Sequence, residues 1–157
     1  MQHSHWRKQI NLSSGLARIE RFLAASGFDQ APWAVVAMIA GHGLLAFRDP
    51  YGIRPLCLGQ GKDGTVMVAS ESVALEGTGH DFVRDIAPGE AVFIGLDGEM
   101  RFEQCAANPQ LYPCVFEFVY LARPDSVMDG ISVYQARLNL GETLAQRVIS
   151  TMPPSAI

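Results

Sequence analysis

Short turn-forming segments interrupt the chain repeatedly between residues 41 and 98, and they limit each regular element there to a few residues. Glycine adopts backbone angles that other residues avoid and proline fixes φ, so each segment marks a change of chain direction. The stretches between them fit antiparallel strands joined by hairpins. The turn segments are Gly41-His42-Gly43, Asp49-Pro50-Tyr51-Gly52, Gly61-Lys62-Asp63-Gly64, Pro88-Gly89 and Leu96-Asp97-Gly98.

The intervening sequence predicts strands and one short helix. The continuous apolar run Trp33 to Ile39 predicts a strand buried on both faces. Ser70 to Leu75 predicts one or two helical turns, with Ser70 as the N-cap and Glu71 near the positive end of the helix dipole. The other predicted strands are Leu44 to Arg48, Leu56 to Gly59, Thr65 to Ala69, Ala91 to Ile94 and Met100 to Glu103.

Both ends of the chain differ in character from this strand-rich part. Residues 12–26 carry apolar side chains at helical spacing and predict an amphipathic helix. Residues 108–113, with Pro109 and Pro113, predict a linker. After it, Ser132 and Gln135 predict a capping box that opens a helix. The part beyond the linker is too short to bury a stable core alone, so it predicts the opening of a second domain.

Composition excludes several classes of function. A net charge of −4 argues against a nucleic-acid surface, which needs clustered Lys and Arg. The longest apolar stretch, residues 31–40, is far shorter than the roughly 20 residues that span a bilayer. Cys57, Cys105 and Cys114 are odd in number and lack CxxC spacing, so we expect neither a disulfide framework nor a zinc site. These observations predict a reduced, cytoplasmic, globular protein.

Isolated histidines and cysteines give no convincing catalytic site. His42 and His80 lie in Gly-containing turns without a nucleophile or acid beside them in sequence. His3 and His5 could bind a metal together, although a mobile terminus is the simpler interpretation. Cys57 lies inside a predicted strand, which favours a core position over a nucleophile. We therefore predict no catalytic, substrate-binding or metal-ligating residue in this chain.

Two local clusters are more specific. In residues 47–56, Arg48 and Arg54 are held by two prolines and a glycine, and their planar donors would suit a carboxylate or backbone carbonyls. The simpler alternative is a hairpin in which Arg48 and Asp49 pair at the surface. Residues 117–126 form the second cluster, an apolar element followed by the polar loop Arg123-Pro124-Asp125-Ser126.

Taken together, these segments resemble the amidophosphoribosyltransferase family. The family pattern includes GHG, FRDPxGIRPL, VASES-AL, D-APGEA, CxFEYVYxARPDS and SVY-AR in this order. The matching segments here are Gly41 to Gly43, Phe47 to Leu56, Val68 to Leu75, Asp85 to Ala91, Cys114 to Ser126 and Ser132 to Arg137. The order and spacing agree over residues 34–150.

The resemblance implies an α+β fold. It would comprise part of the α/β/β/α sandwich of an N-terminal-nucleophile (Ntn) glutaminase, with antiparallel sheets, and the first element of a phosphoribosyltransferase domain. Residues 31–107 would be the C-terminal half of a class II glutamine amidotransferase domain. Residues 108–113 would be the linker and 114–157 the start of the phosphoribosyltransferase domain. Residues 1–30 match poorly.

The family's reaction takes glutamine, phosphoribosyl pyrophosphate and water to 5-phosphoribosylamine, glutamate and pyrophosphate, the first step of purine biosynthesis. This chain begins Met1-Gln2-His3 instead of with the family's nucleophilic Cys, and it lacks the Asp-Asp loop that binds phosphoribosyl pyrophosphate. We therefore expect a fragment that is inactive alone. The alternatives are a non-catalytic binding or assembly module, and residual glutaminase activity with Cys57 as a substitute nucleophile.

The resemblance also sets expectations for cofactors, partners and sites. Magnesium would serve the pyrophosphate in the full enzyme, and we expect no cofactor here and no iron–sulfur cluster, although some members have a cysteine at the position of Cys114. Partners would be the two substrates and further copies in a homo-oligomer, without nucleic acid or membrane. Tyr120 and Arg123 are predicted to lie at the route that ammonia takes between the two domains. The predicted structural motif residues are Arg48, Asp49, Gly52, Arg54, Ser70 and Glu71.

Overall fold

The computed structural model describes residues 32–151. The predicted helix over residues 12–26 and the pair His3 and His5 lie outside the described residues.

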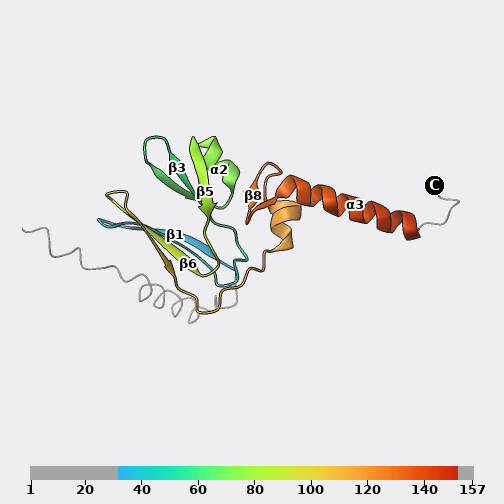
Figure 1. Ribbon diagram of the computed structural model, residues 1–157, viewed down its shortest axis with the longest axis horizontal. Helices are drawn as coiled ribbons and strands as arrows, with labels where there is room; N and C mark the ends of the chain where they lie inside the picture. Colours follow the sequence, from blue (N-terminus) through green and yellow to red (C-terminus); the bar gives the residue numbers. More distant parts are fainter. Residues whose placement is uncertain (1–31, 152–157) are drawn as a thin grey trace, which may run out of the picture.

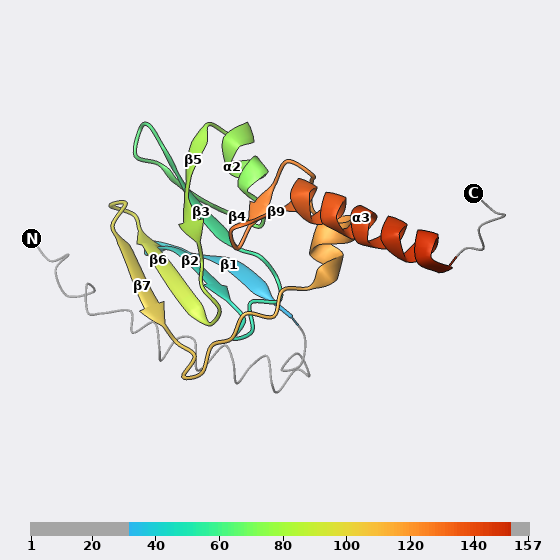
Figure 2. The same cartoon turned by 45° about the vertical axis from the view of Figure 1, so that its right-hand side comes forward.

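The first sheet has four antiparallel strands in the order β1-β2-β6-β7 (Figure 2). They are β1 (Ala34–Ile39), β2 (Gly43–Arg48), β6 (Glu90–Gly95) and β7 (Met100–Gln104). Two tight hairpins join β1 to β2 and β6 to β7, and both were predicted from their turn segments. The Gly98 amide donates to the Gly95 carbonyl at 2.9 Å, as expected for the Asp97-Gly98 turn.

The second sheet has three antiparallel strands in the order β4-β3-β5. They are β3 (Cys57–Gly61), β4 (Val66–Ala69) and β5 (His80–Asp85). The sequence did not predict β5, because its large apolar side chains Phe82 and Val83 are exposed and give no buried pattern. It pairs with β3 through an irregular register at Leu58/Gly59, which no local signal specifies.

The two sheets pack against each other around one apolar core. Side chains from both contribute to it, including Ala46, Leu58, Val92 and Ile94. Helix α2 (Ser72–Gly77) packs on the outer side of the second sheet, where Leu75 contacts Gly59. The predicted α+β fold with face-to-face antiparallel sheets is confirmed. The second sheet covers the middle of the inner face of the first sheet, whereas Val36 and Phe102, on the same face, stay exposed.

Strand β1 differs from its prediction. It was expected to be buried on both faces, yet it is an edge strand of the first sheet. Val36 and Met38 lie on the same face as the core residue Ala46 but are not covered there, and Met38 is 85% exposed. A continuous apolar run is compatible with either position, because periodicity does not show which neighbours a strand has. On its other face Val35 and Trp33 pack near Phe47, whose ring lies 5.2 Å from the Trp33 ring in an edge-to-face arrangement.

The beginning of helix α2 also differs. Ser70 was predicted as the N-cap, but the N-cap is Glu71, with extended backbone angles and no side-chain bond to the helix. The Glu71 carboxylate instead accepts hydrogen bonds from Arg123 and Ser126, which lie in a loop distant in sequence.

Beyond residue 104 the chain leaves the sheets without regular structure and reaches a smaller second segment, residues 114–151 (Figure 1). Its elements are the single π-helical turn η1 (Glu117–Leu121), the short hairpin of β8 (Val127–Met128) and β9 (Ile131–Ser132), and helix α3 (Val133–Thr151). Ser132 Oγ accepts a hydrogen bond from the Gln135 amide at 3.3 Å, so half of the predicted capping box is present. The Gln135 side chain binds Asn139 instead of returning to the cap.

Within residues 32–151, no helix has the length and apolar character needed to cross a membrane.

Candidate functional site

Arg48, at the end of β2, is the centre of a polar junction between the two sheets and the second segment. Its side chain is 1% exposed, and its guanidinium makes five hydrogen bonds. Three go to the carbonyls of Gly52, Arg54 and Ile86 at 2.7–2.9 Å. The other two form a bidentate pair with Asp129 at 2.7 and 2.8 Å. A guanidinium has five N–H donors, so this buried charge is fully paired.

The partner, Asp129, is positioned by the turn between β8 and β9. Asp129 and Gly130 both have positive φ, 50° and 73°. This is the two-residue Asp-Gly turn that antiparallel strands favour. The sequence analysis missed it, although an Asp-Gly pair between apolar residues was a usable signal. The surface pair of Arg48 with Asp49 that the sequence offered as an alternative does not form.

Asp49 instead organises the loop that follows it. Its carboxylate accepts hydrogen bonds from the amides of Tyr51, Ile53 and Arg54 at 2.9–3.4 Å. Gly52 has φ +57°, and a Cβ there would lie 2.8 Å from Pro88 Cγ and 3.2 Å from Arg48 Cζ. The site therefore requires glycine. A rigid loop results, and its carbonyls face Arg48.

Helix α2 provides the second contact across the junction. Glu71 Oε2 accepts from the Arg123 amide at 2.8 Å and from Ser126 Oγ at 2.7 Å. Ser72 Oγ accepts from the Val127 amide at 2.9 Å. A third contact is the ion pair of Arg54 with the buried Glu117 of η1.

Of the predicted structural motif residues, all except Ser70 make contacts at this junction. Among its partners, the sequence analysis did not single out Glu117 or Asp129.

The two residues predicted at the ammonia route lie on the side of the junction that belongs to the second segment. Arg123 forms a bidentate pair with Asp125 at 3.0 and 2.8 Å. Both partners are exposed, so the pair orders the loop and adds little stability. Tyr120 is 79% exposed. Their role at an ammonia route stays a prediction.

Cys57 is unsuited to nucleophilic attack. It is 2% exposed, and burial, followed by the charge of Asp85, raises the pKa of its thiol to about 12. A thiolate is the reactive form, so this cysteine is inert near neutral pH. It occupies the core position that the sequence favoured.

The other candidate ligands are also accounted for. His42 lies in the β1–β2 turn, 2.9 Å from the Ala40 carbonyl, and His80 contacts Thr65 and Thr78 at the start of β5. Within residues 32–151, no three His, Cys, Asp or Glu side chains are grouped to hold a metal ion. The magnesium that the resemblance implies therefore finds no ligand set in this part of the chain, and we assign it no step here.

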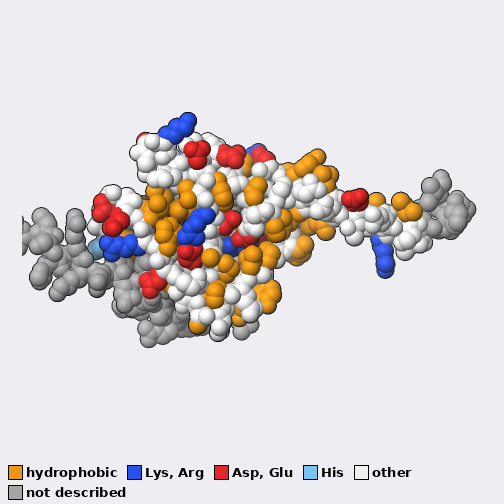
Figure 3. Space-filling view, viewed as in Figure 1, with side chains coloured by type: hydrophobic (Ala, Val, Ile, Leu, Met, Phe, Trp, Pro, Cys, Tyr) orange, Lys and Arg blue, Asp and Glu red, His pale blue; other side chains and the backbone are white. Residues whose placement is uncertain are grey.

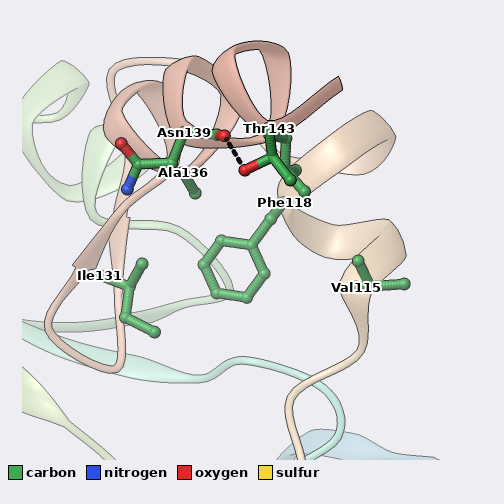
Figure 4. Close-up of a pocket in the computed structure, with 7 residues that line it drawn as sticks. Val115, Phe118, Ile131, Ala136, Asn139 and Thr143 are labelled. Atoms are coloured by element: carbon green, nitrogen blue, oxygen red, sulfur yellow. Dashed lines mark hydrogen bonds between the residues drawn. The ribbon is translucent and has the colours of Figure 1, made fainter. Parts of the chain in front are cut away.

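An apolar groove lies next to the junction, between η1, β9 and α3 (Figure 4). It has a volume of about 330 Å³, and the Phe118 ring points into it. Figure 3 shows hydrophobic side chains gathered around the base of α3. The residues that line the groove are Val115, Phe118, Ile131, Ala136, Asn139, Leu140 and Thr143.

No protein-family model matches the chain. Curated relatives do match, and they are named amidophosphoribosyltransferase. The protein from Pasteurella multocida is 53% identical over 119 residues, which cover 74% of this chain and 24% of that protein. The one from Escherichia coli is 50% identical over 142 residues, which cover 88% of this chain and 27% of that protein. The chain thus spans about a quarter of the length of these relatives.

Two solved structures share the fold. One is the glutamine phosphoribosylpyrophosphate amidotransferase from B. subtilis in complex with ADP and GMP, with a TM-score of 0.68 and 38% identity; the match covers 73% of this chain and 25% of that one. The other is described as the allosteric regulatory enzyme of purine biosynthesis, with a TM-score of 0.63 and 40% identity. This match covers 68% of the present chain and 22% of the solved one.

Proposed function

The chain is homologous to about a quarter of amidophosphoribosyltransferase, and from this relationship we propose that it supplies a corresponding part of such an enzyme. That part would be the later half of the glutaminase domain and the first element of the phosphoribosyltransferase domain. The complete enzyme would convert glutamine, phosphoribosyl pyrophosphate and water to 5-phosphoribosylamine, glutamate and pyrophosphate in the cytoplasm. Identity of 50–53% to these relatives carries this proposal.

The proposed role of this part is structural coupling. Three segments that carry much of the resemblance, Phe47 to Leu56, Val68 to Leu75 and Cys114 to Ser126, meet in the polar junction. Arg54 pairs with Glu117, and Glu71 accepts hydrogen bonds from Arg123 and Ser126. A buried, fully paired network fixes the relative position of two elements better than apolar contact does, because hydrogen bonds depend on direction. The junction would hold the glutaminase part against the phosphoribosyltransferase part.

A chimera tests this function. Residues 34–150 of this chain would replace the matching segment of the E. coli enzyme, and glutamine-dependent release of pyrophosphate would be measured. We expect synthesis within about tenfold of the parent, because half of the exchanged residues are identical. A folded chimera without synthesis would refute the proposal. A Cys57→Ala chimera should keep its activity.

The isolated chain should release no glutamate from glutamine above background. Cys57, the cysteine considered as a substitute nucleophile, is buried and its pKa is raised. Loss of a nucleophile costs many orders of magnitude in rate. Glutamate release that disappears in Cys57→Ala would show that Cys57 is a substitute nucleophile.

Tyr120 and Arg123 are proposed to lie at the ammonia route, where Tyr120 would exclude water and Arg123 would hold the loop through its pair with Asp125. A tyrosine ring excludes water while its hydroxyl satisfies a neighbour, which suits passage of neutral ammonia. The exposure of Tyr120 leaves its ring available to other parts of a complete enzyme. In the chimera, Tyr120→Ala should leave glutaminase activity intact while glutamine-supported synthesis falls. If ammonia-supported and glutamine-supported synthesis fall equally, Tyr120 has a packing role in the second segment and no role in ammonia passage.

The alternative function is an assembly module, and the apolar groove favours it. Leu138, Leu144 and Ile149 are exposed along α3, and such surfaces mark protein contacts. A homo-oligomer belongs to the same proposal. Size-exclusion chromatography of the chain, alone and with complete E. coli enzyme, tests it: co-elution without activity in the chimera would favour the assembly role.

A further inference from the structure

We propose that Glu71 is a positioning residue through which the glutaminase part sets the conformation of the loop over residues 122–127, and thereby the efficiency of ammonia transfer. The inference rests on the proposed function and assigns a role to a residue that carries no catalytic chemistry.

The first observation is the shared acceptor. A single carboxylate oxygen of Glu71 receives hydrogen bonds from the Arg123 amide at 2.8 Å and from Ser126 Oγ at 2.7 Å. These two donors lie at the two ends of the Arg123-to-Ser126 turn, which the Ser126 amide closes onto the Arg123 carbonyl at 3.1 Å. Glu71 therefore fixes both ends of the turn at once. Charge-assisted bonds of this kind are the stronger ones in proteins.

The second observation is burial. Ser126 is fully buried, and its hydroxyl donates to Glu71. A buried donor without a partner is costly, and the loop would have to move to satisfy it. Ser72 extends the same contact by accepting from the Val127 amide. The loop thus depends on two consecutive side chains at the start of α2.

The third observation separates two kinds of support. On the other side of the loop, Arg137 of α3 donates to the carbonyls of Phe118 and Ala122 at 2.7 Å each. Arg137 belongs to the same segment as the loop, so it keeps η1 and α3 together whatever the sandwich does. Glu71 and Ser72 belong to the sandwich, so their hydrogen bonds fix the loop that carries Arg123 relative to the sandwich.

The experiment uses a complete enzyme that carries residues 34–150 of this chain, with Glu71→Ala, Glu71→Gln and Ser126→Ala. The matched control is Glu76→Ala, an exposed glutamate on the same helix that makes no contact at the junction. Three rates are measured: glutamate release, synthesis supported by added ammonia, and synthesis supported by glutamine. The decisive quantity is product formed per glutamate released.

For Glu71→Ala we expect that ratio to fall by about threefold to tenfold, with glutamate release and ammonia-supported synthesis each within about twofold of the parent. Glu71→Gln, which keeps an uncharged acceptor, should lie between the parent and Glu71→Ala. Ser126→Ala should shift the ratio in the same direction by less, and Glu76→Ala should leave it unchanged.

An unchanged ratio in Glu71→Ala would overturn the inference, as would a proportional fall of all three rates, which would indicate a purely structural role. If Glu71→Ala does not fold, Glu71→Gln and Ser126→Ala decide by the same criterion. Absence of both half-reactions from the parent enzyme would refute the proposed function itself and the inference with it. The inference fails by itself if the parent enzyme is active and the ratio of product to glutamate does not change in Glu71→Ala.

Discussion

The sandwich, residues 34–104, and the second segment, residues 114–151, are stabilised in different ways. The sandwich buries an apolar core between its sheets, with Phe47, Leu58 and Val92 almost completely enclosed. The second segment has one small cluster, in which Phe118 and Met128 are the largest members. Most large apolar side chains of α3 are exposed. The apolar burial that stabilises the sandwich is therefore largely missing from the second segment.

What the second segment has instead is polar attachment. Its hairpin turn is held by Arg48, its loop by Glu71 and its π-helical turn by Arg54. Apolar cores tolerate small shifts, whereas a bidentate ion pair fixes distance and direction. The contrast indicates that the sandwich supplies the stability and the junction fixes where the second segment lies. The variants below, made in the full chain, test this division.

Removing Arg48 should have the largest effect. Arg48→Met leaves the Asp129 carboxylate and three carbonyls without their donor inside a buried site. Loss of one partner from a buried ion pair costs about 3–5 kcal/mol. Urea unfolding of the variant should show a loss of that size in the free energy of unfolding.

The control is Arg101→Met, which removes an exposed arginine paired with Glu99. Pairs of this kind contribute about 0–1 kcal/mol. If Arg48→Met costs no more than the control, the buried pair of Arg48 with Asp129 does not hold the second segment on the sandwich.

The next effect should come from Gly52, which shapes the loop on the sandwich side. Gly52→Ala combines a strained positive φ with contacts to Pro88 and Leu111 of 2.8 and 3.0 Å. We expect a loss of about 2–4 kcal/mol. Gly64→Ala is the matched control, since Gly64 has φ +84° and open space around a new Cβ. It should lose about 1 kcal/mol. Equal losses in thermal unfolding would mean that the loop adapts and does not constrain Arg48.

The sequence predicted the parts of this molecule that local signals determine. The β1–β2 and β6–β7 hairpins follow from turn residues next to short apolar runs, and the start of α3 follows from Ser132. The junction could not be predicted in the same way. Arg48 and Asp129 are 81 residues apart, and nothing near either residue indicates the other.

The errors have the same origin. Ser70 was a reasonable N-cap, but the N-cap is Glu71, and its carboxylate binds a loop 52 residues away. Strand β5 was missed because its pairing with β3 is not local. The candidate residues were recognised by resemblance, and their partners became visible only when the fold brought both segments together.

A smaller effect is expected within the second segment. Ser132→Ala removes the hydroxyl that accepts from the Gln135 amide at the start of α3. Loss of an N-cap costs about 1 kcal/mol. Because α3 buries few side chains of its own, this loss should appear as faster hydrogen exchange in its first turns, with β3 and β6 unchanged. Ser150→Ala, which removes a hydroxyl bonded to the Arg147 carbonyl at the other end, is the control. Faster exchange throughout the sandwich would contradict the independence of the two regions.

The smallest effect concerns Asp85, which belongs to the sandwich and faces the Asp129 turn. Burial, followed by the charge of Asp129, raises the pKa of the Asp85 carboxyl, although a backbone hydrogen bond from Asp129 and the charge of Arg48 oppose the shift. The native state therefore binds this proton more tightly than the unfolded state does. Stability from this group is present below the unfolded pKa and is lost as pH rises through the raised native pKa.

Asp85→Asn removes the charge at every pH and keeps an acceptor for that backbone bond. We expect the variant to be more stable than the parent near pH 7. The difference should shrink as pH falls through the raised native pKa of Asp85, because the parent carboxyl then becomes protonated. Other carboxylates titrate in both proteins and cancel in the difference. Asp81→Asn, exposed on the same strand, controls for loss of a carboxylate from β5. Urea unfolding across this pH range measures both. If Asp85→Asn is instead less stable than the parent near pH 7, and this deficit disappears in acid, the attraction of Asp85 to Arg48 outweighs its burial and its repulsion from Asp129. The junction would then have two carboxylates stabilising one arginine.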